Sequence, residues 1–159
     1  MAKEKELSVR VNQIRPSGIR RIFDIACASP DGIDLSIGDP DFDIPNPIKE
    51  EGIKWIRQGF NRYVSTQGIP ELREKVCKHL HSQSIKYEDV LITAGATGGY
   101  MLAILALVGP GDEVVIPDPY FVAYANVVIM CGGIPKFINT YPDFTLREEE
   151  IVPLITDNT

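Results

Sequence analysis

The sequence is poor in the residues from which disulfide frameworks and metal centres are built. It has three cysteines and two histidines among 159 residues. Cys27, Cys77 and Cys131 are odd in number and widely separated, which fits neither a set of disulfides nor a zinc site. His79 and His81 are two positions apart on a predicted helix and therefore point to different faces, which argues against a shared metal ion. We expect no metal site and a reducing compartment, the cytoplasm.

Long apolar runs and an excess of basic residues are also missing. The longest apolar run, residues 101–108, is far shorter than the roughly 20 residues that cross a bilayer. The first six residues carry charges where a signal peptide needs an apolar stretch. Sixteen Lys and Arg against 22 Asp and Glu give a net charge of −6, which repels phosphate backbones. We expect neither a membrane nor a nucleic acid as partner.

What is present is the pattern of a layered globular fold. Hydrophobic residues make up 44% of the chain, and Gly and Pro separate its apolar segments. From residue 88 onward, segments of strand length alternate with segments of helix length, which predicts parallel strands joined by right-handed crossovers. The expected fold class is α/β. Strands are expected at residues 89–93, 113–116 and 134–138, and helices at residues 100–108 and 120–131.

The first half of the chain is less regular. Residues 1–32 have weak periodicity and are interpreted as an arm with one short helix near residues 19–28. A short strand is expected at residues 33–37, a helix at residues 46–58, and a second helix that begins at Pro70.

A glycine-rich segment follows the strand expected at residues 89–93. Its sequence, Gly95-Ala-Thr-Gly-Gly99, also precedes a helix, so backbone N–H groups and the positive end of a helix dipole converge there. Gly95 allows a phosphate group to approach the backbone closely, and Thr97 can add a hydroxyl donor. A phosphate cradle and a plain tight turn are both compatible with this segment alone.

Tyr120 follows the next strand of the pattern, in the segment Pro117-Asp-Pro-Tyr120. In an open α/β sheet, ligands bind beyond the carboxyl ends of the strands. The glycine-rich segment and Tyr120 are therefore expected at the same edge, where the tyrosine ring could lie against an aromatic ligand. A proline-rich turn with a tyrosine at the edge of the core is the other interpretation.

Five segments in a fixed order carry a resemblance to one family. They are Arg15-Pro-Ser-Gly-Ile-Arg20, Ile33-Asp-Leu-Ser-Ile-Gly-Asp-Pro-Asp-Phe42, Arg62-Tyr63 with Gly68-Ile-Pro-Glu-Leu-Arg73, Gly95-Ala-Thr97, and Gly109-Pro-Gly-Asp-Glu-Val114 leading to Pro117-Asp-Pro-Tyr120. This combination resembles the class I/II aminotransferases, the pyridoxal-phosphate enzymes of fold type I, and especially their aspartate-aminotransferase-like branch. The resemblance implies an N-terminal arm followed by the first, incomplete part of an α/β/α large domain with a mostly parallel sheet.

The resemblance implies a cofactor site for pyridoxal 5′-phosphate. Gly95, Ala96 and Thr97 would hold the cofactor phosphate, and Tyr120 would stack on the pyridine ring. Tyr63 would reach across a homodimer interface to the cofactor phosphate of the partner subunit.

The resemblance also implies the substrates and the domain organisation. Gly38 would donate its backbone N–H to the α-carboxylate of an amino acid, with aspartate as a candidate, whose amino group passes to a 2-oxo acid. Residues 1–45 would form the arm, which packs on the partner subunit, and the start of the small domain. Residues 46–159 would form the first part of the cofactor-binding large domain.

The catalytic lysine of this family is absent from the sequence. It forms a Schiff base with the cofactor and lies in a Ser-x-Ser-Lys-like segment that would follow residue 159. Of the lysines present, only Lys86, in Ser84-Ile-Lys86, resembles that segment. It precedes the glycine-rich loop, which is the wrong place for the catalytic lysine. We therefore expect an N-terminal portion of a longer enzyme, without turnover of its own and without a catalytic residue in these 159 positions.

Two other functions remain open on the residues alone. Residues 93–99 also resemble the nucleotide loop of a Rossmann-like NAD(P)-binding domain, with Asp118 placed to meet a ribose. Met101 stands where the third glycine of that loop would be, and the loop begins some ninety residues into the chain. A non-catalytic, truncated module that dimerises through its arm is the second alternative.

Overall fold

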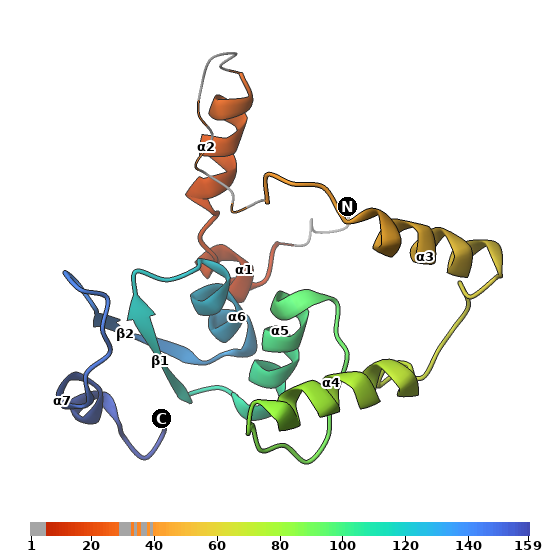
Figure 1. Ribbon diagram of the computed structural model, residues 1–159. Helices are drawn as coiled ribbons and strands as arrows, with labels where there is room; N and C mark the ends of the chain where they lie inside the picture. Colours follow the sequence, from red (N-terminus) through yellow and green to blue (C-terminus); the bar gives the residue numbers. More distant parts are fainter. Residues whose placement is uncertain (1–5, 29–32, 34, 36–37, 39) are drawn as a thin grey trace, which may run out of the picture. The chain divides into compact units, whose positions relative to one another are not determined.

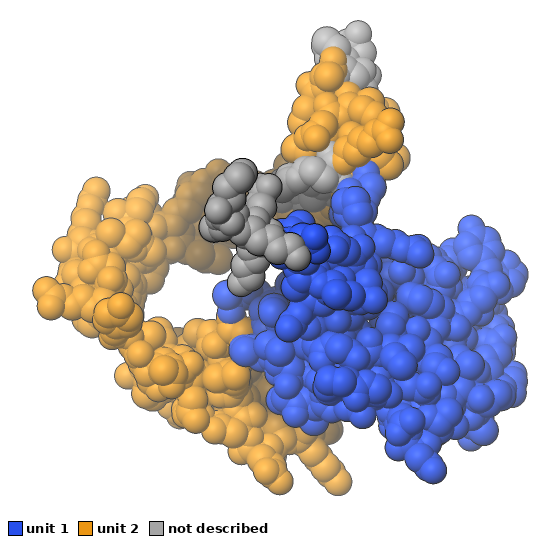
Figure 2. All heavy atoms as spheres, turned by 180° about the vertical axis from the view of Figure 1, so that it is seen from behind, with its two compact units in different colours: residues 1–18, 94–159 blue, residues 19–93 orange. Residues whose placement is uncertain are grey.

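The structure, a computed structural model, describes residues 6–28, 33, 35, 38 and 40–159 (Figure 1). Its elements are α1 (Val9–Gln13), α2 (Gly18–Cys27), α3 (Asn46–Arg57), α4 (Pro70–Ser82), α5 (Gly95–Leu107), β1 (Glu113–Asp118), α6 (Ala123–Cys131), β2 (Ile134–Asn139), α7 (Glu148–Ile151) and the 3-10 helix η1 (Val152–Leu154). The chain divides into two compact units (Figure 2). Unit 1 comprises residues 1–18 and 94–159, and unit 2 comprises residues 19–93.

Unit 1 is built around a parallel β-α-β arrangement. Strands β1 and β2 pair in parallel, from Glu113 opposite Ile134 to Asp118 opposite Asn139. Helix α6 connects them and ends at Gly132, whose φ of +89° lets the chain turn back into β2. The strands expected at residues 113–116 and 134–138 are thus confirmed, with β1 two residues longer and β2 one residue longer. The α/β class with a parallel sheet is also confirmed.

The core of unit 1 lies between α5, α6 and the sheet. The residues that form it are Ile104 of α5, Ile116 of β1, and Ala125, Val127 and Val128 of α6. Helix α5 is apolar on all sides, yet Ile104 is its one buried residue. Leu102, Leu105 and Leu107 are half or more exposed. This helix therefore presents an uncovered apolar surface within the described part of the chain.

Unit 2 contains the three helices α2, α3 and α4 (Figure 2, orange). They confirm the helices expected near residues 19–28, at residues 46–58 and from Pro70, with small shifts at the ends. None of the residues of α3 and α4 is buried. The strand expected at residues 33–37 lies largely outside the described residues, because residues 34, 36 and 37 are among those not described.

The strand expected at residues 89–93 is wrong. The structure describes this segment fully, and β1 and β2 are the strands that pair among the described residues. A strand needs a neighbour whose ladder receives its N–H and C=O groups. Here the carbonyl oxygen of Val90 accepts from the Arg73 side chain, and the N–H of Ile92 donates to the carbonyl oxygen of Gln67. The segment is therefore irregular chain held by a helix and a turn.

The described residues include no helix with the length and apolar character needed to cross a bilayer. The three cysteines are free thiols, with Cys27 exposed and Cys77 and Cys131 half-buried.

Candidate functional site

Helix α5 begins at Gly95, five residues before the helix start that the sequence predicted. Gly95 has a φ of +71°, a left-handed value that glycine adopts without the strain a Cβ would cause. Glycines have low helix propensity, which is why the segment was expected to be a loop. Packing of α5 around the buried Ile104 outweighs that propensity, so the glycine-rich segment forms the first turns of the helix.

The first turn of α5 has the electrostatics of an anion site. Ala96 and Thr97 lie where backbone N–H groups have no carbonyl four residues back within the helix. The helix has 13 residues and no acidic residue in this turn, so the partial positive charge of its dipole is not neutralised there. Gly95, Ala96 and Thr97 are exposed, and no described heavy atom lies within 4 Å of the point where a Gly95 Cβ would be. A phosphate group fits this end of the helix.

Tyr120 follows β1 by two residues and is held from two sides. Its ring stacks on the ring of Phe137 in β2, with centroids 4.9 Å apart and planes at 24°. It also packs against the core of unit 1 and is half-buried. The carbonyl oxygen of Asp118 accepts from both the N–H and the hydroxyl of Thr140, each at 2.9 Å, which fixes the end of β1.

The two parts of the predicted cofactor site lie at one end of unit 1. Helix α5 ends at Leu107, and a short turn leads from it into β1 at Glu113. Figure 1 shows the N-terminal end of α5 and the arrowhead of β1 on the same side. Residues 95–97 form the first turn of α5, and Tyr120 follows β1 by two residues, so the two candidate parts belong to these two ends.

A second tyrosine, Tyr100, lies one helical turn further along α5 and is turned into the protein. Its hydroxyl donates to the carbonyl oxygen of Tyr124 at 3.2 Å, and the two rings lie 5.0 Å apart. Burial, with Tyr124 and Cys131 nearby, raises the pKa of Tyr100 above its ordinary value. This phenol stays protonated at neutral pH and joins α5 to α6 beside the candidate site.

Tyr63 and Gly38 belong to unit 2. Tyr63 is fully exposed, and with Asn61 and Arg62 it lines an open cavity of about 540 Å³. Gly38 is exposed, and among the described residues no heavy atom lies within 4 Å of the position of a Cβ built on it. The roles expected for these two residues remain predictions.

A group of polar contacts that the sequence reasoning missed joins α4 to residues 89–92. Arg73, in the first turn of α4, is the centre of this group and reaches the side chains of Gln67 and Asp89 and the carbonyl oxygen of Val90. The N–H of Val90 first, and the Arg73 guanidinium second, lower the pKa of the Asp89 carboxyl below its ordinary value. The segment Gly68-Ile-Pro-Glu-Leu-Arg73 carries part of the family resemblance, but its sequence does not reveal which atoms the arginine contacts.

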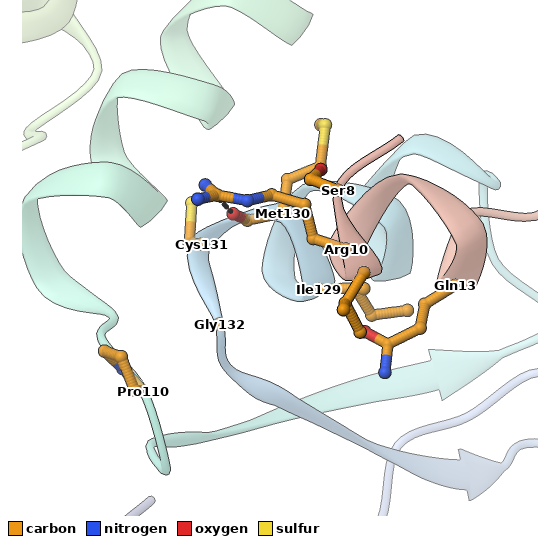
Figure 3. A pocket seen from close by; sticks show the side chains of 9 residues that line it. Ser8, Arg10, Gln13, Pro110, Ile129, Met130, Cys131 and Gly132 are labelled. Carbon is orange, nitrogen blue, oxygen red and sulfur yellow. Dashed lines mark hydrogen bonds between the residues drawn. The ribbon is translucent and has the colours of Figure 1, made fainter. Parts of the chain in front are cut away.

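Unit 1 also has a cavity away from the predicted cofactor residues, shown in Figure 3. It has a volume of about 510 Å³ and lies between α1, the end of α6 and Pro110. Arg10 donates through Nη1 to the carbonyl oxygen of Met130 at 3.3 Å, near the carboxyl end of α6. The side-chain amide of Asn126 binds both backbone groups of Arg15. These contacts dock the N-terminal segment on α6, and the sequence predicted neither α1 nor this docking.

Comparison with known proteins gives a consistent result. The family described as "Aminotransferase class I and II" matches residues 30–159. The aspartate aminotransferase of Pyrococcus abyssi is 37% identical over 159 residues, which cover 96% of this chain and 41% of that protein. The aromatic-amino-acid aminotransferase 2 of Thermococcus litoralis is 36% identical, with the same two coverages. The crystal structure of aspartate aminotransferase from Thermotoga maritima superimposes with a TM-score of 0.88 at 31% identity, over 96% of this chain and 43% of that one.

Each comparison covers a much larger share of this chain than of the relative. Nearly all of this chain matches, whereas it spans about two fifths of the length of the relatives. The matched part includes the N-terminal end of α5 and the end of β1, where residues 95–97 and Tyr120 lie.

Proposed function

The chain belongs to the class I and II aminotransferase family, and we propose that it forms part of a pyridoxal-phosphate-dependent enzyme that transfers an amino group from an amino acid to a 2-oxo acid. The observation that carries the proposal is that the exposed N-terminal end of α5 and the carboxyl end of β1, which Tyr120 follows, lie on the same side of unit 1. A phosphate and a flat heteroaromatic ring are the two parts of pyridoxal 5′-phosphate that a protein has to hold.

The residues of the site fit the cofactor chemically. The N–H groups of Ala96 and Thr97, with the Thr97 hydroxyl, would bind the phosphate, and Gly95 leaves room beside them. Tyr120 would pack against the ring, and Phe137 keeps the tyrosine in place. When bound, the cofactor supplies a conjugated ring that delocalises negative charge developing at the substrate Cα. Gly38 would orient the substrate by donating its backbone N–H to the carboxylate.

The substrate is proposed as a class. Every amino-group transfer of this kind uses an amino acid and a 2-oxo acid. One relative described above is named for aspartate and another for aromatic amino acids, at 37% and 36% identity. That difference is too small to choose between them. Aspartate therefore stays a candidate among the amino acids.

The assembly is proposed from the expected role of Tyr63. Its side chain is fully exposed, which is the state required of a residue that reaches into a partner subunit. Helix α2, in the arm, exposes Ile22 and Ile25 by more than half, and apolar surface of this kind supports an interface. We propose a homodimer in which the arm packs on the partner and Tyr63 approaches the partner's cofactor phosphate. Three free thiols support a cytoplasmic location.

The proposal can be tested by comparing the affinity of the site for the ring with its phosphate and for the ring without it. Pyridoxal phosphate itself reacts with lysine side chains, of which the chain has eight. Pyridoxine 5′-phosphate lacks the aldehyde, so its binding reports on the site alone. We expect isothermal titration calorimetry to show at least about tenfold tighter binding of pyridoxine 5′-phosphate than of pyridoxine, because a charge-assisted hydrogen bond contributes about 1.5–3 kcal/mol.

Two threonine variants locate the binding. Thr97→Val removes one hydroxyl from the first turn of α5 and is expected to weaken binding of pyridoxine 5′-phosphate several-fold. Thr145→Val removes the hydroxyl of another exposed threonine of unit 1 and is expected to leave binding unchanged. Equal affinities for pyridoxine and its phosphate, or equal losses in the two variants, would contradict the proposed function.

A further inference from the structure

The guanidinium of Arg73 connects two parts of unit 2 that are distant in sequence. Its Nε donates to the carbonyl oxygen of Val90 at 2.8 Å, and its Nη1 donates to Oε1 of Gln67 at 3.1 Å. Its Nη2 is paired with the carboxylate of Asp89. Three acceptors in three directions match the planar, forked shape of a guanidinium, which a lysine ammonium cannot reproduce.

Backbone contacts add a second connection at the same place. The N–H of Ile92 donates to the carbonyl oxygen of Gln67 at 3.0 Å. Gly68 comes so close to Ile92 that a Cβ on the glycine would lie 2.5 Å from Cγ1 of the isoleucine. Residues 89–92 are therefore held against the turn at Gly68 by main chain, side chain and shape together.

The position of Arg73 has an electrostatic cost. It lies in the first turn of α4, where the positive end of the helix dipole disfavours a cation. Its side chain is 22% exposed, so it also loses part of its hydration. An ordinary surface ion pair contributes little, so it would not offset both costs. The three hydrogen bonds of the guanidinium together offset these costs, and two of them, to Asp89 and Val90, hold the start of residues 89–92 beside α4.

The held segment leads directly into the candidate phosphate site. After Ile92, only Thr93 and Ala94 precede the start of α5 at Gly95. Residues 89–92 and the first turn of α5 are therefore close neighbours along the chain. If residues 89–92 were loose, ligand binding at residues 95–97 would have to order them as well, and affinity would fall.

We propose that Arg73 is a positioning residue for the phosphate site at residues 95–97, acting by fastening residues 89–92 to the turn at Gly68. The inference rests on the proposed function, because it assigns Arg73 a role in holding the ligand of that site. Arg73 does not itself contact the phosphate in this scheme. Its effect passes along the chain through Val90 and Ile92.

The test compares three variants of the 159-residue chain by two measurements. Arg73→Gln removes the guanidinium, and Arg73→Lys keeps the positive charge without the forked geometry. Lys78→Gln is the matched control, because it removes a cation of the same helix that pairs with Glu74 on the surface. Hydrogen exchange followed by mass spectrometry reports protection of residues 89–92, and calorimetry reports the affinity for pyridoxine 5′-phosphate.

We expect both Arg73 variants to lose protection at residues 89–92 and to bind pyridoxine 5′-phosphate about tenfold or more weakly, on the scale that loss of positioning costs. The control should match the wild type in both measurements. If Arg73→Gln does not fold by circular dichroism, Asp89→Asn, which leaves the other two bonds of Arg73, is expected to give a smaller loss in the same two measurements.

The outcomes separate this inference from the proposed function. Wild-type chain that does not distinguish pyridoxine 5′-phosphate from pyridoxine overturns the proposed function and the inference with it. Wild-type chain that distinguishes them, together with Arg73 variants of unchanged affinity, overturns the inference alone. Full rescue by Arg73→Lys would also overturn it, since charge and not geometry would then carry the effect.

Discussion

Tyr120 and Phe137 form a stacked pair across the parallel sheet, with ring centroids 4.9 Å apart and an interplanar angle of 24°. Tyr120 follows β1 and Phe137 lies in β2, opposite Ile116. Because β2 is held in register with β1, Phe137 is a rigid support for the tyrosine ring. The ring expected to contact the cofactor is thus placed by the sheet itself and not by its own loop.

This pair is expected to contribute a measurable coupling energy. In a double-mutant cycle with Tyr120→Leu and Phe137→Leu, we expect about 0.5–1.5 kcal/mol of interaction in the free energy of unfolding. The pair Tyr141 and Phe144, whose side chains are about two-thirds exposed, is the control and should couple more weakly. Urea denaturation of the seven chains, the wild type with the single and double variants of each pair, measures both couplings. Equal coupling in the two pairs would show that the sheet does not hold Tyr120.

Val128 is the best buried residue of the core and should be the most sensitive to truncation. It is 0% exposed and lies in α6, between α5 and the sheet. Val128→Ala removes two methyl groups and leaves a cavity, so we expect a loss of about 2 kcal/mol in the free energy of unfolding. Val152→Ala, at a position 55% exposed, should cost less than about 0.5 kcal/mol. Similar losses at both positions would contradict the packing of this core.

The ion pair between Glu113 and Lys136 should give the stability of unit 1 an acid-sensitive component. The Lys136 Nζ lies 2.9 Å from Glu113 Oε1, and the Thr156 hydroxyl donates to Oε2 at 2.8 Å. Lys136 first and Thr156 second lower the pKa of Glu113 below its ordinary value of 4.5. The folded state therefore gains stability that is complete above that value and is lost as the pH falls through the lower pKa of the folded protein.

Glu113→Gln tests this pH dependence. Its free energy of unfolding should lie below that of the wild type by a constant amount at neutral pH, and the gap should close as the pH falls below 4.5. Lys136→Met removes the main cause of the shift, so Glu113→Gln in that background should produce a smaller pH-dependent gap. Chemical denaturation from pH 7 to pH 3 measures all four chains. A gap that stays constant below pH 4.5 would rule out the ion pair as the source.

The parts of the fold that were predicted from sequence are those fixed by local chemistry. Gly132 adopts a positive φ at the end of α6, and such a residue is an unambiguous stop signal in the sequence. The length and apolar character of residues 113–116 and 134–138 are typical of buried parallel strands.

The predictions about the fold that failed concern segments whose structure depends on partners distant in the sequence. Residues 89–93 have the composition of a strand, but pairing is a property of two segments, and their backbone groups bind Arg73 and Gln67. Helix α5 starts five residues early because packing around Ile104 overrides the low propensity of glycine. The docking of Arg10 and Arg15 on α6 involves contacts between residues more than 100 positions apart in the sequence, and no local sequence pattern indicates it.

Tyr63 offers a test of the proposed homodimer. Tyr63→Phe removes one exposed hydroxyl and should weaken the binding of pyridoxine 5′-phosphate several-fold, since a hydrogen bond to a phosphate is charge-assisted. The loss should occur at protein concentrations where light scattering shows a dimer and disappear where the chain is monomeric. Tyr141→Phe, at another exposed tyrosine, should bind as the wild type. A loss that does not depend on protein concentration would contradict a contribution from the partner subunit.

Gly68 and Gly59 allow the close approach to residues 89–92 to be separated from backbone strain. Both glycines have positive φ values, +103° and +82°, so alanine at either is expected to cost about 1–2 kcal/mol. At Gly59 the described residues leave a Cβ open space, whereas at Gly68 it would lie 2.5 Å from Cγ1 and 2.7 Å from Cβ of Ile92. Gly68→Ala should therefore cost about 1–3 kcal/mol more than Gly59→Ala in the free energy of unfolding.

A second substitution shows whether Ile92 is the cause. Ile92→Ala removes Cγ1 but keeps Cβ, so in the Gly68→Ala background it should recover part of the additional loss and not all of it. The same change in the Gly59→Ala background should recover nothing, because Gly59 does not approach Ile92. Thermal or urea unfolding of the six chains, with hydrogen exchange at residues 89–92, measures the effect. Equal costs for Gly68→Ala and Gly59→Ala would mean that the turn at Gly68 does not pack closely against Ile92. The role proposed for Arg73 would then lose the support of this backbone contact.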